Sequence, residues 1–376
     1  MKIKLCVSAL LISSLIAGAA VCSAQSLRQA ADKIGLLVGA AVNPSLFSNP
    51  DYAATLAREF NMIEPENVMK WATIEPKRGV FNFVPGDQVV AFAEAHDMKV
   101  RGHNLLWHQY NPAWLNQGNF TPQQLREIMK NHIFTEVKHY RGKVFAWDVV
   151  NEAFDGKGNV KHSIWYDQPG IGLAGKGTEY IAQALRWAHE ADPKALLFYN
   201  DYAAEGLNAK SDAVYAMVKD FKQRGVPIDG VGLQMHLFDP KSIPLSVAAN
   251  IARLAKLGVQ VHITEMDVAL PVDAEKREPD PKDLAEQAKI YQKMATICAE
   301  SPDCTAFQTW GFTDRYSWIP AYTKGKKGAA LLFDANYKPK PAYTAVLKAL
   351  ARVALEDPEV KEQRLQFERR SLETVR

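Results

Sequence analysis

Eight short apolar runs, rich in β-branched and aromatic residues, recur along the chain and alternate with segments of helical periodicity. The runs are GLLVGAAV around Val38, Met62–Asn67, Val100–Trp107, Val144–Glu152, Leu196–Tyr202, Gly230–His236, Val259–Val268 and Ala306–Phe312. Such alternation is typical of parallel βα units, and eight units in roughly 320 residues predict a single (β/α)₈ barrel. An open doubly wound sheet is the alternative fold, but neither GxGxxG nor GxxxxGK[ST] follows the first run.

The first 24 residues have the pattern of a secretory signal peptide. Lys2 and Lys4 precede an apolar run, Leu5–Val21, and a site of small residues ends at Ala24, where cleavage is expected. A lipid anchor on Cys22 is the alternative. Removing both lysines from the 45 basic residues leaves 43 against 42 acidic residues, which favours neither nucleic acid nor anionic membranes as partners. We therefore expect a protein exported to the periplasm or the medium, monomeric and without membrane attachment after cleavage.

The barrel is expected to span residues 25–354, since no linker or internal repeat marks a second domain. Thr121 followed by Pro122 predicts a helix N-cap and first turn. Residues 355–376 alternate acidic and basic side chains, which predicts a charged helical tail lying on the barrel or fraying from it. The mature chain keeps Cys298 and Cys304, whose spacing suits a disulfide closing a short loop, with two free thiols as the alternative.

Polar side chains gather where the apolar runs end. They are Glu66, Asn67, His103, Trp107, Asn151, Glu152, Asn200, Asp201, Tyr202, Gln234, His236, Glu265, Asp267 and Trp310. In a parallel barrel the carboxyl ends of the strands carry the chemistry. Because burying a lone carboxylate costs several kcal/mol, so many polar strand ends indicate a functional site rather than packing.

The residue types at these ends restrict the chemistry. Serine hydrolases of the nucleophile-elbow type need GxSxG and zinc proteases need HExxH, and neither motif occurs. The histidines do not suggest a metal site, because His262 lies inside an apolar run and tryptophans separate the others. We expect no metal and no cofactor. Two strand-end glutamates among amides, imidazoles and indoles suit cleavage of a glycosidic bond between sugars that stack on the indoles.

Seven motifs, in order, carry a resemblance to a known family. They are FNMIEPENVMKW, VRGHNLLWHQYNPAWL, FAWDVVNEAF, FYNDY, GVGLQMH, VHITEMDV and FQTWGFTDRYSW. The chain resembles glycoside hydrolase family 10, the endo-β-1,4-xylanases, over nearly the whole mature length. The resemblance implies a (β/α)₈ barrel, xylan and xylo-oligosaccharides as substrates, and a retaining double-displacement mechanism.

Roles follow from the resemblance position by position. Glu152 matches the general acid/base and Glu265 the nucleophile, with their carboxyl groups expected about 5–5.5 Å apart. Asn151 matches a contact to the sugar 2-hydroxyl, His236 an imidazole bonded to the nucleophile, and Asp267 the partner of that imidazole. The other expected substrate contacts are His103, Trp107 and Gln234 around the cleaved sugar, Glu66, Asn67 and Lys70 one sugar further, Trp310 and Trp318 as an aromatic roof, and Asn200 and Tyr202 on the reducing side. Some members also carry a disulfide where Cys298 and Cys304 lie.

Two other functions remain open at this point. The first is a related barrel glycosidase that cleaves β-1,4-glucan; Trp318 argues for xylan, because the roof would clash with a sugar hydroxymethyl group. The second is a catalytically silent polysaccharide-binding barrel, although both glutamates are present. The chain also departs from the family, with Gln109-Tyr110 after LLWH, where Tyr110 is a candidate for stacking. A long Gly-rich loop follows Glu152, and its Trp165 is expected either to stack on sugar or to pack in the core.

Overall fold

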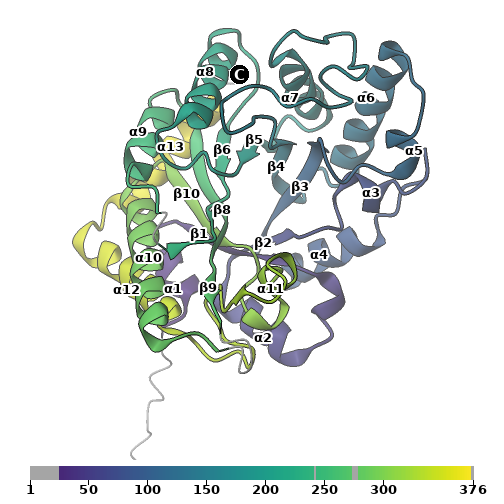
Figure 1. Cartoon of the computed structure of the whole chain (residues 1–376). Coiled ribbons are helices and arrows are strands. Elements are labelled where there is room, and N and C mark those ends of the chain that lie inside the picture. Colours follow the sequence, from purple (N-terminus) through teal and green to yellow (C-terminus); the bar gives the residue numbers. More distant parts are fainter. Residues whose placement is uncertain (1–24, 241–242, 273–277, 374–376) are drawn as a thin grey trace, which may run out of the picture.

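The computed structural model describes residues 25–240, 243–272 and 278–373, so the predicted signal peptide lies outside the described residues. The barrel strands are β1 (Leu37–Val42), β2 (Met62–Pro65), β3 (Lys99–Trp107), β4 (Val144–Asn151), β5 (Leu196–Asp201), β6 (Gly230–Leu233), β8 (Gln260–Val268) and β10 (Cys304–Thr309). All are parallel and hydrogen-bonded in chain order, and β10 pairs with both β8 and β1, which closes the barrel (Figure 1). Each predicted apolar run overlaps one of these strands. The predicted fold class is confirmed.

Helices surround the barrel (Figure 1). They are α1 (Leu27–Lys33), α2 (Pro50–Glu59), α3 (Trp71–Ile74), α4 (Val84–Ala95), α5 (Ala113–Asn116), α6 (Pro122–His139), α7 (Glu179–Ala191), α8 (Ala209–Gln223), α9 (Val247–Ala255), α10 (Pro281–Glu300), α11 (Ile319–Tyr322), α12 (Pro341–Glu356) and α13 (Val360–Glu373). The predicted start of α6 is confirmed, since the Thr121 side chain accepts from the Gln124 amide in a capping box. None of the helices in the described part of the chain is long and apolar enough to span a membrane.

Short strands and turns complete the rim. Strand β7 (His236–Leu237) pairs with the end of β8, while β9 (Leu270–Pro271) and β11 (Lys327–Gly328) form a small antiparallel pair. The 3-10 turns η1 (Pro44–Leu46) and η3 (Asp314–Tyr316) lie in the loops after β1 and β10. Because β7 continues the line of β6, the His236 side chain is brought beside the end of β8.

Strand register places the polar strand ends in one row. Trp107 at the end of β3 lies opposite Asn151 of β4, and Asn151 lies opposite Asn200 of β5. All nine residues of β8 are buried, which is expected for a strand covered by side chains on the barrel interior and by helices outside. Glu265 is therefore a carboxyl group inside the protein, facing the same end of the barrel as Asn151.

The charged C-terminal segment forms α13 and is attached through a buried arginine. Arg364 is fully buried, and its guanidinium donates to the carbonyl oxygens of Ala299 and Ser301 at 3.1 Å and of Cys304 at 3.2 Å. It also donates to Ile34 at the end of α1. Cys298 and Cys304 form the predicted disulfide beside these carbonyl groups. The tail thus joins the N-terminal helix to the end of α10.

Replacing Arg364 by alanine is expected to lower the free energy of unfolding by about 3 kcal/mol, because several buried carbonyl groups lose a charged donor. Chemical denaturation measures the change. Arg352→Ala is the matched control: its side chain is 42% exposed and pairs with Glu300 and Glu356, so we expect a loss under about 1 kcal/mol. Equal losses in the two variants would contradict the anchoring role of Arg364.

Candidate active site

An open cleft of about 860 Å³ lies at the carboxyl ends of the strands. The predicted catalytic and sugar-contacting residues that line it are Glu66, Asn67, Lys70, His103, Trp107, Asn151, Glu152, Tyr202, Gln234, His236, Glu265, Trp310 and Trp318. Asp267 is fully buried beneath them. The structure therefore brings together all of these positions, which are spread over some 250 residues of sequence between Glu66 and Trp318.

Glu265 is a buried carboxylate held by two donors. Its side chain is 5% exposed; Oε1 accepts from Asn200 Nδ2 at 2.7 Å, and Oε2 lies 3.0 Å from His236 Nε2. Burial alone would raise the pKa of Glu265, but the hydrogen bonds from His236 and Asn200 and the charges of His103 and His236 bring that pKa below its ordinary value. Glu265 is therefore ionised at neutral pH.

His236 is the cationic partner of that carboxylate. Burial would lower its pKa, but Asp267 and Glu265 together raise the pKa well above the usual value for histidine. Its Nδ1 lies 3.0 Å from Asp267 Oδ2, which also accepts from Trp318 Nε1 at 2.8 Å. One carboxylate thus orients both the imidazolium under Glu265 and the indole that covers the cleft.

Glu152 has a different environment at the end of β4. Its Oε2 accepts from Trp107 Nε1 at 3.1 Å, and its Oε1 accepts from Gln234 Nε2 at 3.1 Å and from Asn151 Nδ2 at 3.3 Å. Its backbone has φ +57°, a left-handed conformation that is strained for a residue with a side chain and that clusters at functional sites. All three donors to the Glu152 carboxyl are neutral, whereas Glu265 faces an imidazolium.

Asn200 does not lie where the sequence predicted. It was expected to contact sugar on the reducing side, but it is fully buried and donates through Nδ2 to Glu265 Oε1 and to Asn151 Oδ1. The prediction is wrong because the Asn200 side chain points into the barrel. The Tyr202 side chain is instead 39% exposed and lines the cleft, with the Lys210 ammonium 3.6 Å from its ring centre.

A second group of cleft residues surrounds Lys70. Its ammonium donates to Asn67 Oδ1 at 3.0 Å and lies 5.2 Å from the ring centre of Trp107 and 5.6 Å from that of Trp310. Burial lowers the pKa of Lys70 and raises that of Glu66, while the charge of each opposes the shift of the other. Together they offer a cation, a carboxyl group, an amide and two indole faces, which suits several hydroxyl groups of one sugar.

Trp165 and Tyr110, whose roles the sequence left open, lie in different environments. Trp165 is buried, stacks on Trp71 with ring centres 5.0 Å apart, and donates from Nε1 to the carbonyl oxygen of Trp107 at 3.0 Å. It is a core residue that supports the backbone at Trp107. Tyr110 is 46% exposed, and its ring lies nearly parallel to Trp107 at 6.5 Å.

Three charged residues beneath the cleft were missed by the sequence analysis. Glu64, Arg101 and Asp148 are all fully buried; Arg101 pairs with Asp148 and, at 3.3 Å, with Glu64. Asp148 also holds His103, whose Nδ1 lies 2.9 Å from its Oδ2. The sequence did contain a signal for this cluster, because each of the three is a charged residue within one of the apolar runs.

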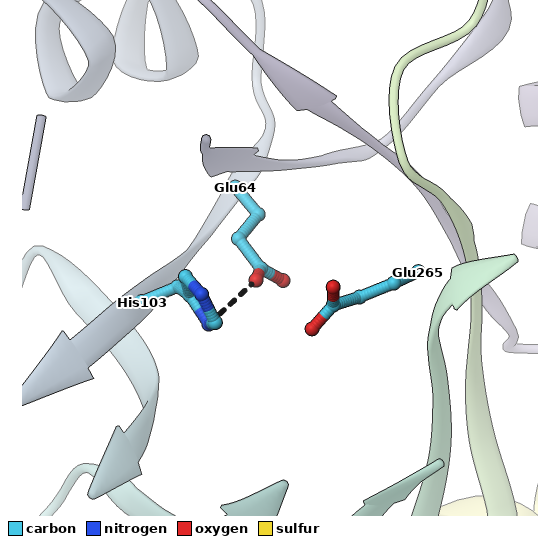
Figure 2. A group of neighbouring side chains, drawn as sticks. All are labelled: Glu64, His103 and Glu265. Carbon is cyan, nitrogen blue, oxygen red and sulfur yellow. Dashed lines mark ion pairs between the residues drawn. The ribbon is translucent and has the colours of Figure 1, made fainter. Parts of the chain in front are cut away.

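Glu64, His103 and Glu265 point toward one another, with polar atoms within 4.8 Å (Figure 2). Nitrogen and oxygen atoms so close are compatible with a transition metal. Hydrogen bonds with Asp148, Asn200 and His236 account for the positions of His103 and Glu265, and the guanidinium of Arg101 already supplies a positive charge to Glu64. The absence of a metal stays a prediction.

An ionised carboxylate and a second carboxyl group in one cleft, with stacking and hydrogen-bonding residues around them, can cleave a glycosidic bond. A sequence profile of glycosyl hydrolase family 10 matches residues 26–349. The chain belongs to glycosyl hydrolase family 10. The predicted resemblance is confirmed, and the protein is a glycoside hydrolase.

Similar proteins cover most of the chain. Endo-1,4-beta-xylanase B of Thermotoga neapolitana is 45% identical over 324 residues, which are 85% of this chain and 90% of that protein. An endo-1,4-beta-xylanase of Agaricus bisporus is 40% identical over 309 residues, 81% of this chain and 88% of that protein. The crystal structure of xylanase 10B from Thermotoga petrophila RKU-1 in complex with xylobiose has a TM-score of 0.82 at 44% identity and covers 88% of this chain and 98% of that one.

Proposed function

We propose that this family 10 member is an endo-β-1,4-xylanase that hydrolyses internal xylosidic bonds with retention of configuration. The observation that carries the proposal is the pair of glutamates in one cleft with unlike surroundings. Glu265 is buried beside the His236 imidazolium, which keeps it ionised, as a nucleophile must be. Glu152 lies at the cleft among neutral donors, which suits a group that gives and takes a proton.

The reaction runs in two displacements. In the first, a Glu265 oxygen bonds to the anomeric carbon, the glycosidic carbon–oxygen bond breaks, and the leaving oxygen takes the proton from Glu152. In the second, ionised Glu152 takes a proton from water, the water oxygen bonds to the anomeric carbon, and Glu265 leaves as a carboxylate. Asn151, whose Nδ2 lies 3.3 Å from the Glu152 carboxyl, is proposed to bond the sugar 2-hydroxyl.

Product analysis tests the proposal. Xylan, arabinoxylan and carboxymethyl cellulose are incubated with the enzyme, and NMR follows the first anomer released. We expect xylo-oligosaccharides of several lengths, with the β-anomer first. An α-anomer would contradict retention, cleavage of cellulose alone would favour the glucanase alternative, and binding of xylan without any release of sugar would favour the silent barrel.

Preference for xylose is proposed to depend on Trp318. Its indole is held by Asp267 and lies 5.1 Å from the His236 ring, so it forms a fixed roof where a sugar hydroxymethyl group would extend. Trp318→Ala is expected to raise kcat/KM for cello-oligosaccharides relative to xylo-oligosaccharides about tenfold. Trp318→Phe keeps most of the roof and loses the hydrogen bond, and it should leave this ratio near the wild-type value. A ratio unchanged in the alanine variant would remove Trp318 from the specificity argument.

His236→Gln is expected to move the acid limb of the kcat/KM profile to higher pH. The imidazolium lowers the pKa of Glu265, so losing it raises that pKa, and the nucleophile becomes protonated at a higher pH than in the wild type. The pH dependence of kcat/KM on a xylo-oligosaccharide measures the shift. An acid limb that stays in place or moves to lower pH would contradict the role assigned to His236.

Export is part of the same proposal. Residues 1–24 are proposed to be removed after Ala24, and the Cys298–Cys304 disulfide supports an oxidising destination, in the periplasm or outside the cell. N-terminal sequencing of the mature protein should begin at Gln25, and its mass should carry no lipid. We propose that the mature protein acts as a monomer, which sedimentation measures.

A further inference from the structure

Glu64 lies on β2 directly beneath the cleft, and neither predicted catalytic role uses it. Its Oε2 accepts from Gln308 Nε2 at 2.7 Å and lies 3.3 Å from Arg101 Nε. Its Oε1 lies 3.4 Å from His103 Nδ1 and has no hydrogen-bond partner among the described residues. Figure 2 shows the Glu64 carboxyl group facing both His103 and Glu265.

Two short chains of contacts connect Glu64 to the groups around the reacting sugar. Through Gln308, which also donates to the carbonyl oxygen of Thr264 at 2.6 Å, Glu64 reaches the backbone immediately before Glu265. The second chain runs through Arg101 to Asp148, which holds His103. A change at Glu64 is therefore expected to affect side chains on both sides of the cleft.

Burial and the neighbouring carboxylates favour the neutral form of Glu64. The charged and titratable groups that face it are Arg101 and His103 from β3, Asp148 from β4, Lys70 at the start of α3 and Glu265 from β8. Burial and then the charge of Asp148 raise the pKa of Glu64 well above its ordinary value, although Arg101 opposes the shift. The Arg101 guanidinium donates to Asp148 through two nitrogens, so its positive charge compensates a negative charge on Glu64 only in part.

The proton has one suitable position. Oε2 already accepts from Gln308 and forms an ion pair with Arg101, whereas Oε1 has no hydrogen-bond partner among the described residues, so the hydroxyl proton belongs on Oε1. If Glu64 and Glu265, whose polar atoms approach within 4.8 Å, were both ionised, they would repel each other and the proton affinity of both would rise. A neutral Glu64 leaves the negative charge on Glu265.

We infer that Glu64 is a third carboxyl group of the active site that works uncharged, as a positioning residue for Glu265 and His103. The inference rests on the proposed role of Glu265 as nucleophile. Substitution by glutamine preserves the neutral charge and one acceptor, whereas leucine preserves only part of the volume.

Infrared difference spectroscopy tests the charge without any substrate. The Glu152→Gln variant, which lacks the carboxyl group of the proposed acid/base, is compared near neutral pH with the Glu64→Gln/Glu152→Gln double variant. We expect the second substitution to remove one protonated-carboxyl carbonyl band that shifts in heavy water. Loss of ionised-carboxylate bands instead would overturn the inference.

Kinetics test the positioning role. Glu64→Gln should keep kcat/KM on xylan within about threefold of wild type, with the acid limb of its pH profile in place. Glu64→Leu should lose kcat on the order of 30-fold with KM nearly unchanged, and circular dichroism and thermal unfolding check that it folds. Movement of the Glu64→Gln acid limb to lower pH by a unit or more would show that Glu64 is charged in the wild type. Full activity in a folded Glu64→Leu variant would remove the positioning role, and if leucine prevents folding, the glutamine variant and the infrared band decide.

Failure of this inference can be separated from failure of the proposed function. A wild-type enzyme that releases no sugar from xylan but shows the protonated band would overturn the function and keep Glu64 neutral. A wild-type enzyme that cleaves xylan with retention but lacks the band would support the function and overturn the neutral state of Glu64.

Discussion

Glu265→Ala is expected to lower kcat on xylan by about 10⁴- to 10⁶-fold, because the variant has no group that can bond to the anomeric carbon. Binding of xylan should change little, since the sugar contacts along the cleft from Glu66 to Trp318 remain. Steady-state kinetics with reducing-sugar detection measures the first effect, and isothermal titration with a xylo-oligosaccharide the second.

The matched control for that experiment is Glu286→Ala. Glu286 is an exposed carboxylate on α10 that pairs only with Lys289 among the residues described, so its loss should leave kcat unchanged. Wild-type turnover in a pure preparation of Glu265→Ala would contradict the proposed mechanism. A small nucleophile such as azide, added to this variant with an aryl xyloside, should give the α-xylosyl product, because it enters from the side that the carboxylate occupied.

Glu152→Ala is expected to show a loss that depends on the leaving group. On xylan kcat/KM should fall on the order of 10²- to 10⁴-fold, because the departing sugar oxygen needs a proton. On a dinitrophenyl xyloside kcat/KM should be nearly unchanged, since that leaving group departs without one. Its kcat should still fall, because no base activates water in the second step, and the glycosyl-enzyme should accumulate as a mass adduct on Glu265.

Two comparisons keep this second prediction decisive. Gln234→Ala removes one hydrogen bond to the Glu152 carboxyl and keeps the carboxyl group, so its losses should be similar on both substrates. Equal losses for xylan and the dinitrophenyl substrate in Glu152→Ala would contradict the acid/base assignment. A steep dependence on leaving group in both variants would point to orientation of Glu152, not its proton, as the limiting feature.

Strand-end residues were predictable because a parallel barrel brings all of its carboxyl ends to one rim. Once the eight runs are placed in order, Glu152 at the end of the fourth strand and Glu265 near the end of the seventh must share that rim. The same logic located Trp107, Asn151 and Tyr202 in the cleft. The order of the strands along the chain is enough to predict which residues share this rim, so no contact between side chains had to be known.

Side-chain direction within the rim was not predictable. Asn200 and Tyr202 are two residues apart, yet one is buried beneath Glu265 and the other is exposed at the cleft. Strand β5 ends at Asp201, so the alternation of side chains stops there and the loop conformation decides the direction of Tyr202. The loop tryptophan Trp165 illustrates the same limit, because nothing in its neighbours along the chain distinguished a core position from a sugar-stacking one.

The sequence by itself determined the barrel, its order of strands and the two glutamates, because hydrophobic periodicity and polar strand ends are local properties of the chain. The charge states of Glu265 and Glu64 depend instead on the tertiary structure. The low pKa of Glu265 depends on His236 and Asn200, and the uncharged state inferred for Glu64 on burial beside Asp148. Proton affinity is set by the charges and donors within a few ångströms of a carboxyl group, and the barrel draws those neighbours from strands that are far apart in sequence.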